Sequence, residues 1–461
     1  MNNSQFIDEK KIWEAIEKHS VSDKVLIEEI LKKSLELKGL SLDDIPPLLT
    51  IKEPELLEEL LKTAKEVKEK IYGKRLVLFA PLYISNLCKN ECIYCAFRST
   101  NKELKRKALS YNEIKKEVEI LVDQGHKRIL LVAGESYPDE GLDYILKAVD
   151  TIYSVKNKGE IRRVNVNIAP LTIDDFKRLK SRKIGTYQLF QETYHRETYK
   201  KMHIGGLKRD YDFRVTVMDR AMEAGINDVG IGVLFGLFDY RFEVMALLQH
   251  SNHLDKEFGA GPHTISVPRI EPASGSKVSE DPPYKVSDID FLKLIAILRL
   301  SVPYTGMILT TRETPEIRRN AFAVGISQIS AGSRTNPGGY SSSEKFDASQ
   351  FSLGDHRNLR EVIEDITKLG YIPSFCTACY RLGRTGKDFM DLAKPGLIQK
   401  HCSPNAIATF AEYLEDYADD EMKTLGYDMI DKHLKELPPN LQKTTMEMVN
   451  FVKEGKRDVY I

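Results

Sequence analysis

The sequence is poor in several features that would point away from a water-soluble enzyme acting on a small molecule. It has no stretch of about 18 uncharged apolar residues, the length that a membrane-spanning helix requires, and its first ten residues contain no apolar leader segment. Net charge is also missing, because 68 lysine and arginine residues balance 68 aspartate and glutamate residues. A neutral chain has no basic field that would attract nucleic acid or an anionic membrane. We therefore predict a cytoplasmic protein with no nucleic-acid or membrane partner.

Cysteine is scarce, and its distribution is informative. The six cysteines of the 461-residue chain form two sets of three: Cys88, Cys92 and Cys95, then Cys376, Cys379 and Cys402. A disulfide framework would scatter cysteines along the chain, whereas compact triplets in a reducing compartment are typical of metal sites. The sequence therefore predicts two metal sites, each with an incomplete set of protein ligands.

The first triplet has three and then two residues between its cysteines, and Tyr94 stands directly before the last one. Three thiolates suit a 4Fe-4S cluster in which three irons have a protein ligand and the fourth is open for chemistry. Structural zinc prefers four ligands, and no fourth cysteine or histidine lies near this triplet in the sequence. A zinc knuckle is thus the less favoured interpretation.

Between residues 74 and 335, β-rich runs alternate with helical patterns, as repeated βα units do. The predicted helices include 110–124, 171–181, 209–224 and 288–299. The eight predicted strands are 75–83, 127–133, 161–168, 184–190, 227–233, 263–267, 304–310 and 326–330. Eight such units favour a closed (β/α)8 barrel of the TIM type with its chemistry at the carboxyl ends of the strands, and a six-stranded open barrel is the alternative.

Three parts of the chain follow from this pattern. Residues 1–73 show amphipathic helical patterns, interrupted at Pro46-Pro47, and predict an N-terminal helical extension. Residues 74–340 form the predicted barrel. A segment rich in glycine, serine and asparagine, 333–343, suggests a boundary, and residues 341–461 form a mainly helical C-terminal domain that carries the second triplet.

The second triplet has two and then 22 residues between its cysteines, and Cys402 stands before Ser403-Pro404, where we expect a helix to begin. A helix N-terminus favours thiolates and an anionic cluster. Five residues nearby in the sequence act in the same direction: Arg381, Arg384, Lys387, Lys400 and His401. A zinc site of three cysteines and His401 is the alternative.

The first triplet, with Tyr94 inside it and a strand-like run before it, resembles the signature of the radical S-adenosylmethionine superfamily. The resemblance implies that S-adenosylmethionine (SAM) chelates the open iron of a 4Fe-4S cluster. It also implies four SAM contacts: Gly134 and Glu135 after the second strand, Glu192 after the fourth, and Arg214 in a segment similar to one in biotin synthase. The glycine-rich run 224–233 resembles the motif that lies along the adenine.

The two triplets together resemble the FeFe-hydrogenase maturases that are radical tyrosine lyases. The resemblance implies cleavage of the L-tyrosine Cα–Cβ bond to p-cresol and dehydroglycine at the first cluster. It further implies conversion of dehydroglycine to carbon monoxide and cyanide at a second 4Fe-4S cluster. Arg334 would hold the tyrosine carboxylate, and His263 would bind a labile additional iron at the second cluster. An internal channel between the two sites is expected.

Two other functions stay open at this stage. The first is 2-iminoacetate synthase of thiamine biosynthesis, a tyrosine lyase that does not require the second cluster. The second is a zinc-stabilised scaffold with no turnover. The maturase interpretation also implies an electron donor such as ferredoxin or flavodoxin, and other hydrogenase maturases as partners.

Overall fold

The computed structural model describes residues 4–19, 21–342 and 348–461, and Ser343, the last residue of the predicted boundary segment, lies outside them. Eight parallel strands form a closed barrel, because β10 pairs with both β9 and β1. The predicted fold class is therefore confirmed. In their order around the barrel the strands are β1 (Arg75–Ser85), β3 (Arg128–Ala133), β4 (Arg163–Asn167), β5 (Tyr187–Gln188), β7 (Val229–Gly232), β8 (Thr264–Ser266), β9 (Gly306–Leu309) and β10 (Gln328–Ser330).

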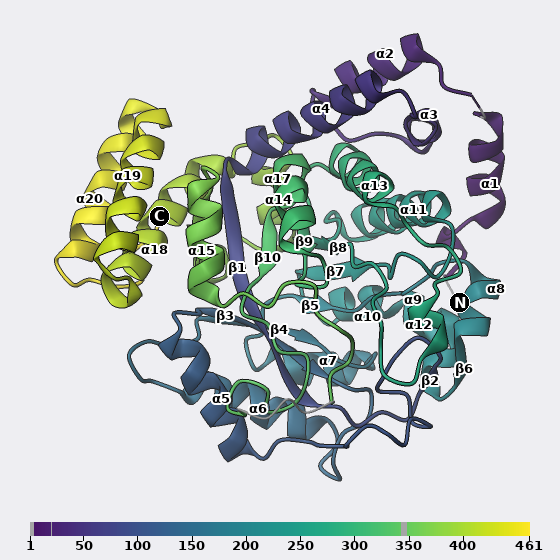
Figure 1. The fold of residues 1–461 in the computed structure, drawn as a ribbon, viewed down its shortest axis with the longest axis horizontal. Helices are drawn as coiled ribbons and strands as arrows, with labels where there is room; N and C mark the ends of the chain where they lie inside the picture. Colours follow the sequence, from purple (N-terminus) through teal and green to yellow (C-terminus); the bar gives the residue numbers. More distant parts are fainter. Residues whose placement is uncertain (1–3, 20, 343–347) are drawn as a thin grey trace.

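Strand β1 is the longest strand and joins three parts of the sheet (Figure 1). Its carboxyl half, from Ala80, pairs with β3, and its middle, Val77–Phe79, pairs with β10. Its amino end, Arg75–Val77, pairs with β11 (Ile372–Ser374), a strand that the sequence did not predict. The C-terminal part of the chain is therefore joined to the amino-end side of the barrel by backbone hydrogen bonds.

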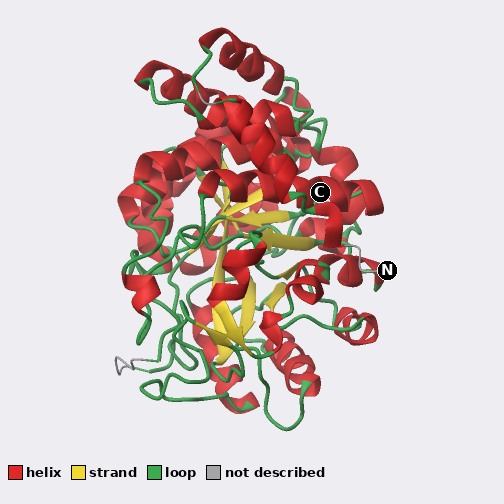
Figure 2. Ribbon diagram, turned by 90° about the vertical axis from the view of Figure 1, so that its right-hand side faces the viewer, coloured by secondary structure: helices red, strands yellow, loops and turns green. Residues whose placement is uncertain are grey.

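Helices surround the barrel on its outer side (Figure 2). The predicted helix 209–224 is two helices, since the chain leaves helical geometry at Thr216. Of the helices between strands, α5 begins with a capping box in which Ser110 and Glu113 satisfy each other's backbone amides. The helices of the barrel are α5 (Tyr111–Asp123), α6 (Leu142–Ser154), α7 (Ile173–Lys180), α8 (Arg196–Met202), η3 (Leu207–Arg209), α9 (Tyr211–Val215), α10 (Val217–Glu223), α11 (Tyr240–Phe258), α12 (Lys277–Glu280), α13 (Asp288–Ser301) and α14 (Pro315–Val324).

The N-terminal helices pack along barrel helices α11 and α13. The expected interruption at Pro46-Pro47 is wrong, because both prolines lie in the first turn of a short helix. Proline is tolerated there, since the amides of a first turn have no partner inside the helix. These elements are η1 (Ser4–Phe6), α1 (Glu9–Lys18), α2 (Lys24–Ser34), η2 (Leu42–Asp44), α3 (Ile45–Leu49) and α4 (Pro54–Tyr72).

The C-terminal helices form a separate layer beside β11 (Figure 1). The expected helix start at Ser403 is wrong, since α18 begins at Gln399 and contains Pro404. Cys402 therefore lies inside the helix, and its amide donates to the carbonyl of Ile398. The helices are α15 (Leu359–Lys368), α16 (Ala378–Arg381), α17 (Gly386–Ala393), α18 (Gln399–Tyr417), α19 (Asp420–Glu436) and α20 (Pro439–Lys453). Over the described residues, none of the helices is sufficiently long and apolar to cross a membrane.

Candidate active site

Most of the predicted site residues line one cavity at the carboxyl ends of the barrel strands, which we call the upper cavity. It encloses about 1270 Å³, open solvent at its mouth included. The predicted residues Cys88, Cys92, Tyr94, Cys95, Gly134, Glu135, Glu192 and Arg214 all line it. Residues that follow three different strands, β1, β3 and β5, thus meet Arg214 of α9 at one place, as the barrel geometry predicts.

A small second sheet holds the first triplet in place. Cys92 belongs to β2 (Glu91–Cys92), which pairs antiparallel with β6 (His203–Gly205). A turn follows in which the Cys95 amide donates to the Cys92 carbonyl at 3.1 Å. Tyr94 is buried and its hydroxyl lies 2.8 Å from Nε2 of His203. The thiols are therefore fixed by backbone pairing.

Gly134 is required by a close approach of two backbone segments. A Cβ atom at this position would lie 2.3 Å from the carbonyl oxygen of Leu87, which immediately precedes Cys88. The Gly134 amide also donates to the Ser85 carbonyl at 2.9 Å. Gly134 therefore allows the cysteine-bearing loop to lie against the end of β3.

Two acids and two bases form a buried network in the upper cavity, beside the first triplet. Arg214 donates to Glu135 at 2.9 Å, and Lys208 donates to Glu192 at 2.7 Å. Arg214 also lies 3.6 Å from Glu192, and Asn90 donates to the second oxygen of Glu135 at 2.8 Å. The network is formally neutral, so it can bind a ligand that carries both a carboxylate and an ammonium group.

Burial and mutual attraction compete in this network. Burial alone would raise the pKa of Glu135, but Arg214 and Lys208 hold it below its usual range. Burial and the neighbouring Arg214 would lower the pKa of Lys208, and Glu192 with Cys92 raises it instead. Glu135 and Lys208 are therefore charged near neutral pH. Glu192 also has a φ of 71°, a strained geometry for a non-glycine residue and one that is typical of functional sites.

The arginine that faces the upper cavity is Arg312 rather than the predicted Arg334. Arg334 is exposed and does not line the cavity, and its guanidinium donates to the Ser333 carbonyl at 3.1 Å. Arg312 lines the cavity directly after β9, and its guanidinium stacks on Phe351 at 3.3 Å. Among the described residues, this guanidinium has no hydrogen-bond acceptor. It is thus free to bind a carboxylate.

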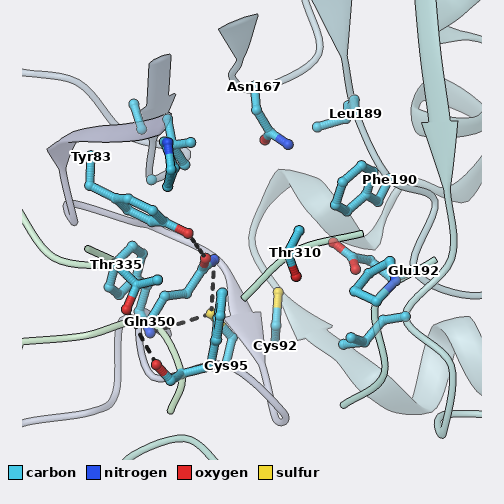
Figure 3. Close-up of a pocket in the computed structure, with 18 of the residues that line it drawn as sticks. Tyr83, Cys92, Cys95, Asn167, Leu189, Phe190, Glu192, Thr310, Thr335 and Gln350 are labelled. Carbon is cyan, nitrogen blue, oxygen red and sulfur yellow. Dashed lines mark hydrogen bonds between the residues drawn. The ribbon is translucent and has the colours of Figure 1, made fainter. Parts of the chain in front are cut away.

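A short chain of hydrogen bonds links the barrel interior to the first triplet (Figure 3). The Tyr83 hydroxyl donates to Oε1 of Gln350 at 2.8 Å, and Nε2 of Gln350 lies 3.9 Å from the Cys95 sulfur. The Phe97 amide donates to the same sulfur at 3.4 Å. Donors directed at sulfur stabilise negative charge on a thiolate ligand.

The second triplet lines a separate cavity at the amino ends of the strands, which we call the lower cavity. It encloses about 560 Å³, open solvent included, and Cys376, Cys379, Cys402 and His263 all line it. Cys376 follows β11, Cys379 lies in α16, and Cys402 lies in the first turns of α18. Three elements of the C-terminal region thus bring this triplet beneath the barrel.

His263 stands immediately before β8 and faces the lower cavity from the barrel side. Its Nδ1 lies 3.5 Å from Oδ1 of Asp228, which in turn accepts from the Gly386 amide at 2.9 Å. Burial lowers the pKa of His263, so the imidazole is neutral near pH 7. A neutral imidazole with one nitrogen facing a carboxylate is the usual state of a metal-binding histidine.

The charges around the second triplet differ from those expected. The cations that act most strongly on Cys376 are Arg75 and Arg128, both from the barrel, and Arg384 acts on Cys379. Arg381 forms an ion pair with Asp458 instead. Burial outweighs these cations and raises the pKa of Cys379 to about 12, and it raises the pKa of Cys88 in the first triplet to about 11. Because burial raises the pKa of these thiols, binding to a metal would have to deprotonate them.

The upper and lower cavities have no lining residue in common. The polar side chains Gln188 and Thr264 lie between them in the barrel, and Nε2 of Gln188 donates to the Thr264 hydroxyl at 3.2 Å. A Cβ atom at Gly230 would lie 2.4 Å from this hydroxyl, so the interior is tightly packed here. The structure therefore counts against an open, continuous channel between the two sites.

In the parts of the chain that the structure describes, no three His, Cys, Asp or Glu side chains converge on a position for one metal ion. Ligands of a structural zinc share one ion in this way. The three cysteines of a cubane bind different irons and stand farther apart. Three thiols at the edge of an enclosed cavity fit such a cluster, and the neutral network beside them fits an amino-acid ligand.

A closed parallel barrel with this arrangement at its carboxyl ends is typical of radical SAM enzymes. The family model of the radical SAM superfamily matches residues 82–249, and that of the Biotin and Thiamin Synthesis associated domain matches residues 266–372. The 2-iminoacetate synthase of Salmonella typhimurium is 30% identical over 344 residues, which are 74% of this chain and 89% of that protein.

Two solved structures are similar over nearly the whole chain. The crystal structure of HydG, a maturase of the FeFe-hydrogenase, has 48% sequence identity and a TM-score of 0.95, covering 99% of this chain and 100% of that chain. The FeFe-hydrogenase maturase HydG from Carboxydothermus hydrogenoformans has 43% identity and a TM-score of 0.85, covering 97% and 99%. The chain belongs to the radical SAM superfamily and, within it, to the HydG family.

Proposed function

We propose that the protein is a radical SAM tyrosine lyase of FeFe-hydrogenase maturation, which cleaves L-tyrosine to p-cresol and dehydroglycine and converts the latter to carbon monoxide and cyanide. The observation that carries this proposal is the pair of cysteine triplets at opposite ends of one barrel, in a chain that is similar to HydG over nearly its whole length. A 4Fe-4S cluster at the first triplet would supply the electron that cleaves SAM to a 5'-deoxyadenosyl radical.

The residues of the upper cavity would bind and orient the two reactants. Arg214 and Glu135 offer a cation and an anion to the amino-acid end of SAM, while Glu192 stands near enough to contact its ribose. Gly134 and Tyr94 keep the cysteine loop in position. Because the cavity is enclosed by the barrel, water is excluded from the radical.

The tyrosine carboxylate needs a cation inside the upper cavity, and we assign that role to Arg312. Its guanidinium is buried and unpaired among the described residues, whereas the exposed Arg334 would have to turn inward. A bidentate pair between guanidinium and carboxylate would fix the Cα–Cβ bond of the substrate relative to the SAM site.

The lower cavity would hold the second 4Fe-4S cluster through Cys376, Cys379 and Cys402. His263 is placed to bind an additional, labile iron, with Asp228 orienting its ring. Because no open channel connects the cavities, transfer of dehydroglycine would require the Gln188 and Thr264 side chains to move. We keep the division into residues 1–73, 74–340 and 341–461 as part of this proposal.

The protein would act in the cytoplasm, where a reducing environment keeps its six unpaired cysteines available for clusters. It would accept electrons from a small donor such as ferredoxin or flavodoxin and deliver its products to other hydrogenase maturases.

The experiment that tests this function compares the wild-type protein with a Cys376→Ala/Cys379→Ala variant, both reconstituted with iron and sulfide without oxygen. Each is supplied with SAM, a reductant and L-tyrosine, and p-cresol and carbon monoxide are measured. We expect both products from the wild type, and p-cresol within about twofold but no carbon monoxide from the variant. Equal carbon monoxide from the variant would contradict the proposal.

The second candidate is 2-iminoacetate synthase, favoured by the relative from Salmonella typhimurium and by the Biotin and Thiamin Synthesis associated domain. That function predicts p-cresol from both proteins and carbon monoxide from neither. The same experiment therefore separates the two candidates.

A further inference from the structure

A strongly basic pocket, which we call the basic pocket, opens at the amino ends of the barrel strands beside the lower cavity. It encloses about 1510 Å³, open solvent included, and contains two acidic side chains, Asp150 and Asp228. Its six cationic side chains are Arg162, Arg163, Lys180, Arg182, Lys183 and Arg381.

Half of these cations are neutralised by acids. Arg162 lies 2.6 Å from Glu412, Arg182 lies 3.4 Å from Asp150, and Arg381 forms an ion pair with Asp458. These pairs account for three of the six positive charges.

The other three cations have no such partner. In the described parts of the chain, no carboxylate lies within ion-pair distance of Arg163, Lys180 or Lys183. The remaining acid, Asp228, accepts from the Gly386 amide and faces His263, and its negative charge offsets only one of these three cations. The basic pocket therefore has an excess of positive charge, which attracts anions from solution and from the lower cavity.

One aromatic side chain separates the basic pocket from the second triplet. Tyr380 lines both cavities and follows Cys379 directly in the sequence. The Arg163 guanidinium stacks on its ring at 3.7 Å, and its hydroxyl lies 3.0 Å from that of Thr186. Arg163 and Thr186 thus hold the Tyr380 side chain in place where the basic pocket adjoins the lower cavity.

We propose that the basic pocket binds the anionic, cyanide-bearing product as it leaves the second cysteine site past Tyr380. This proposal rests on the proposed function, because cyanide that stays bound to iron keeps the negative charge that the pocket selects, whereas free cyanide near pH 7 is neutral hydrogen cyanide. Carbon monoxide is neutral and would gain nothing from these cations. Lysine and arginine side chains near the site where an anion forms attract that anion, and they favour its release toward the basic pocket.

The test uses the full-length, iron-reconstituted protein with hexacyanoferrate(II) as the probe for a cyanide-bearing anion, and pyrophosphate as a comparison anion of similar charge. The variant is Lys180→Gln/Lys183→Gln, since both lysines are exposed and neither touches the two cysteine sites. Lys177→Gln is the matched control, because Lys177 is exposed on the same helix α7 but lies outside the pocket.

We expect calorimetry to show one hexacyanoferrate(II) per wild-type protein, at least tenfold weaker binding to the double variant, and binding within twofold to the control. Unchanged binding to the double variant, or equal weakening in the control, overturns the proposal. Pyrophosphate binding as tight as that of hexacyanoferrate(II) also overturns it, since the pocket would then be a general polyanion site.

Turnover provides a second readout. The double variant should form p-cresol within about twofold of the wild type but release at least fivefold less cyanide into solution per tyrosine cleaved. Equal release from both proteins contradicts the product assignment. A wild type that forms no cyanide at all would instead refute the proposed function, while the calorimetric result would still decide whether the pocket binds anions.

Discussion

The two ends of the barrel hold cysteine triplets in similar backbone settings but in different electrostatic ones. At each end an amide donates to a cysteine sulfur at 3.4 Å, from Phe97 to Cys95 and from Ala378 to Cys376. The upper cavity is lined by three acids and three bases, which balance one another: Glu135, Glu192, Glu271, Lys208, Arg214 and Arg312. Among the described residues that line the lower cavity there are two arginines, Arg75 and Arg128, and no acid.

This difference matches the ligands that each end would bind. SAM and tyrosine each carry an ammonium group and a carboxylate, so a site for them needs both signs of charge. Cyanide bound to iron is anionic, so the site that forms it needs cations. The barrel therefore appears as one scaffold with two sites of opposite design, and each prediction below changes only one of them.

The largest effect is expected from Cys92→Ala at the upper end. Loss of one of three ligands should prevent assembly of the first cluster and reduce p-cresol and carbon monoxide to background. The iron content should fall by about half, since the second cluster remains. Product assays and iron analysis measure these changes, with Cys402→Ala as the mirror variant that should retain p-cresol. Normal p-cresol from Cys92→Ala would refute the assignment of this triplet.

The next effect concerns the buried charge network. Arg214→Ala leaves Glu135 without its guanidinium partner and should destabilise the protein by about 3–5 kcal/mol, measured by denaturant unfolding. The Michaelis constant for SAM should rise in the same variant. Arg196→Ala is the control, because its ion pair with Asp212 is more than one-third exposed and should contribute less than about 1 kcal/mol. An equal decrease in the free energy of unfolding of the two variants would contradict the stabilising role of the buried network.

A smaller effect is expected where tyrosine binds. Arg312→Ala should lower kcat/KM for tyrosine by about 30- to 200-fold, equivalent to the 2–3 kcal/mol of a charge-assisted pair. Arg334→Ala should stay within about twofold of the wild type, because that side chain is exposed. Steady-state p-cresol formation measures both. The opposite ranking would return the carboxylate-binding role to Arg334.

The smallest effect is a pH dependence of stability near the upper cavity. Burial raises the pKa of Glu243 to about 8, and its carboxyl group contacts the Thr193 hydroxyl and the Tyr194 amide. A raised pKa favours the protonated form in the folded state, so this stabilisation is complete below pH 4.5 and is lost as the pH rises toward 8. The free energy of unfolding of the Glu243→Gln variant, measured with urea, should therefore rise by about 2 kcal/mol relative to that of the wild type between pH 5 and pH 7. If the free energy of unfolding changed with pH in the same way for both proteins, the Glu243 carboxyl group would already be charged in the folded wild type.

Much of this architecture can be predicted from the sequence, because the βα alternation repeats a regular pattern. All eight barrel strands fall within or beside the predicted ranges, and the cysteine spacing locates both triplets. The short strands β2, β6 and β11 could not be found in this way, since they lie outside the repeated βα units.

Two residues of the upper cavity were missed for different reasons. Lys208 lies in the short helix η3 and has no sequence signal, because only the folded chain brings it to Glu192. Arg312 did have a signal, as it directly follows the seventh predicted strand, where a barrel places residues for chemistry. Arg334 follows the eighth strand in the same way, and the sequence alone could not show that its side chain faces solvent.

The most direct test of the account is a single anaerobic turnover of the wild-type, iron-reconstituted protein with SAM, reductant and L-tyrosine, in which p-cresol and carbon monoxide are counted together. If both cavities are active sites, we expect both products to form, with p-cresol appearing first. p-Cresol without carbon monoxide, from protein that contains iron at both triplets, would contradict the claim that the lower site completes the reaction.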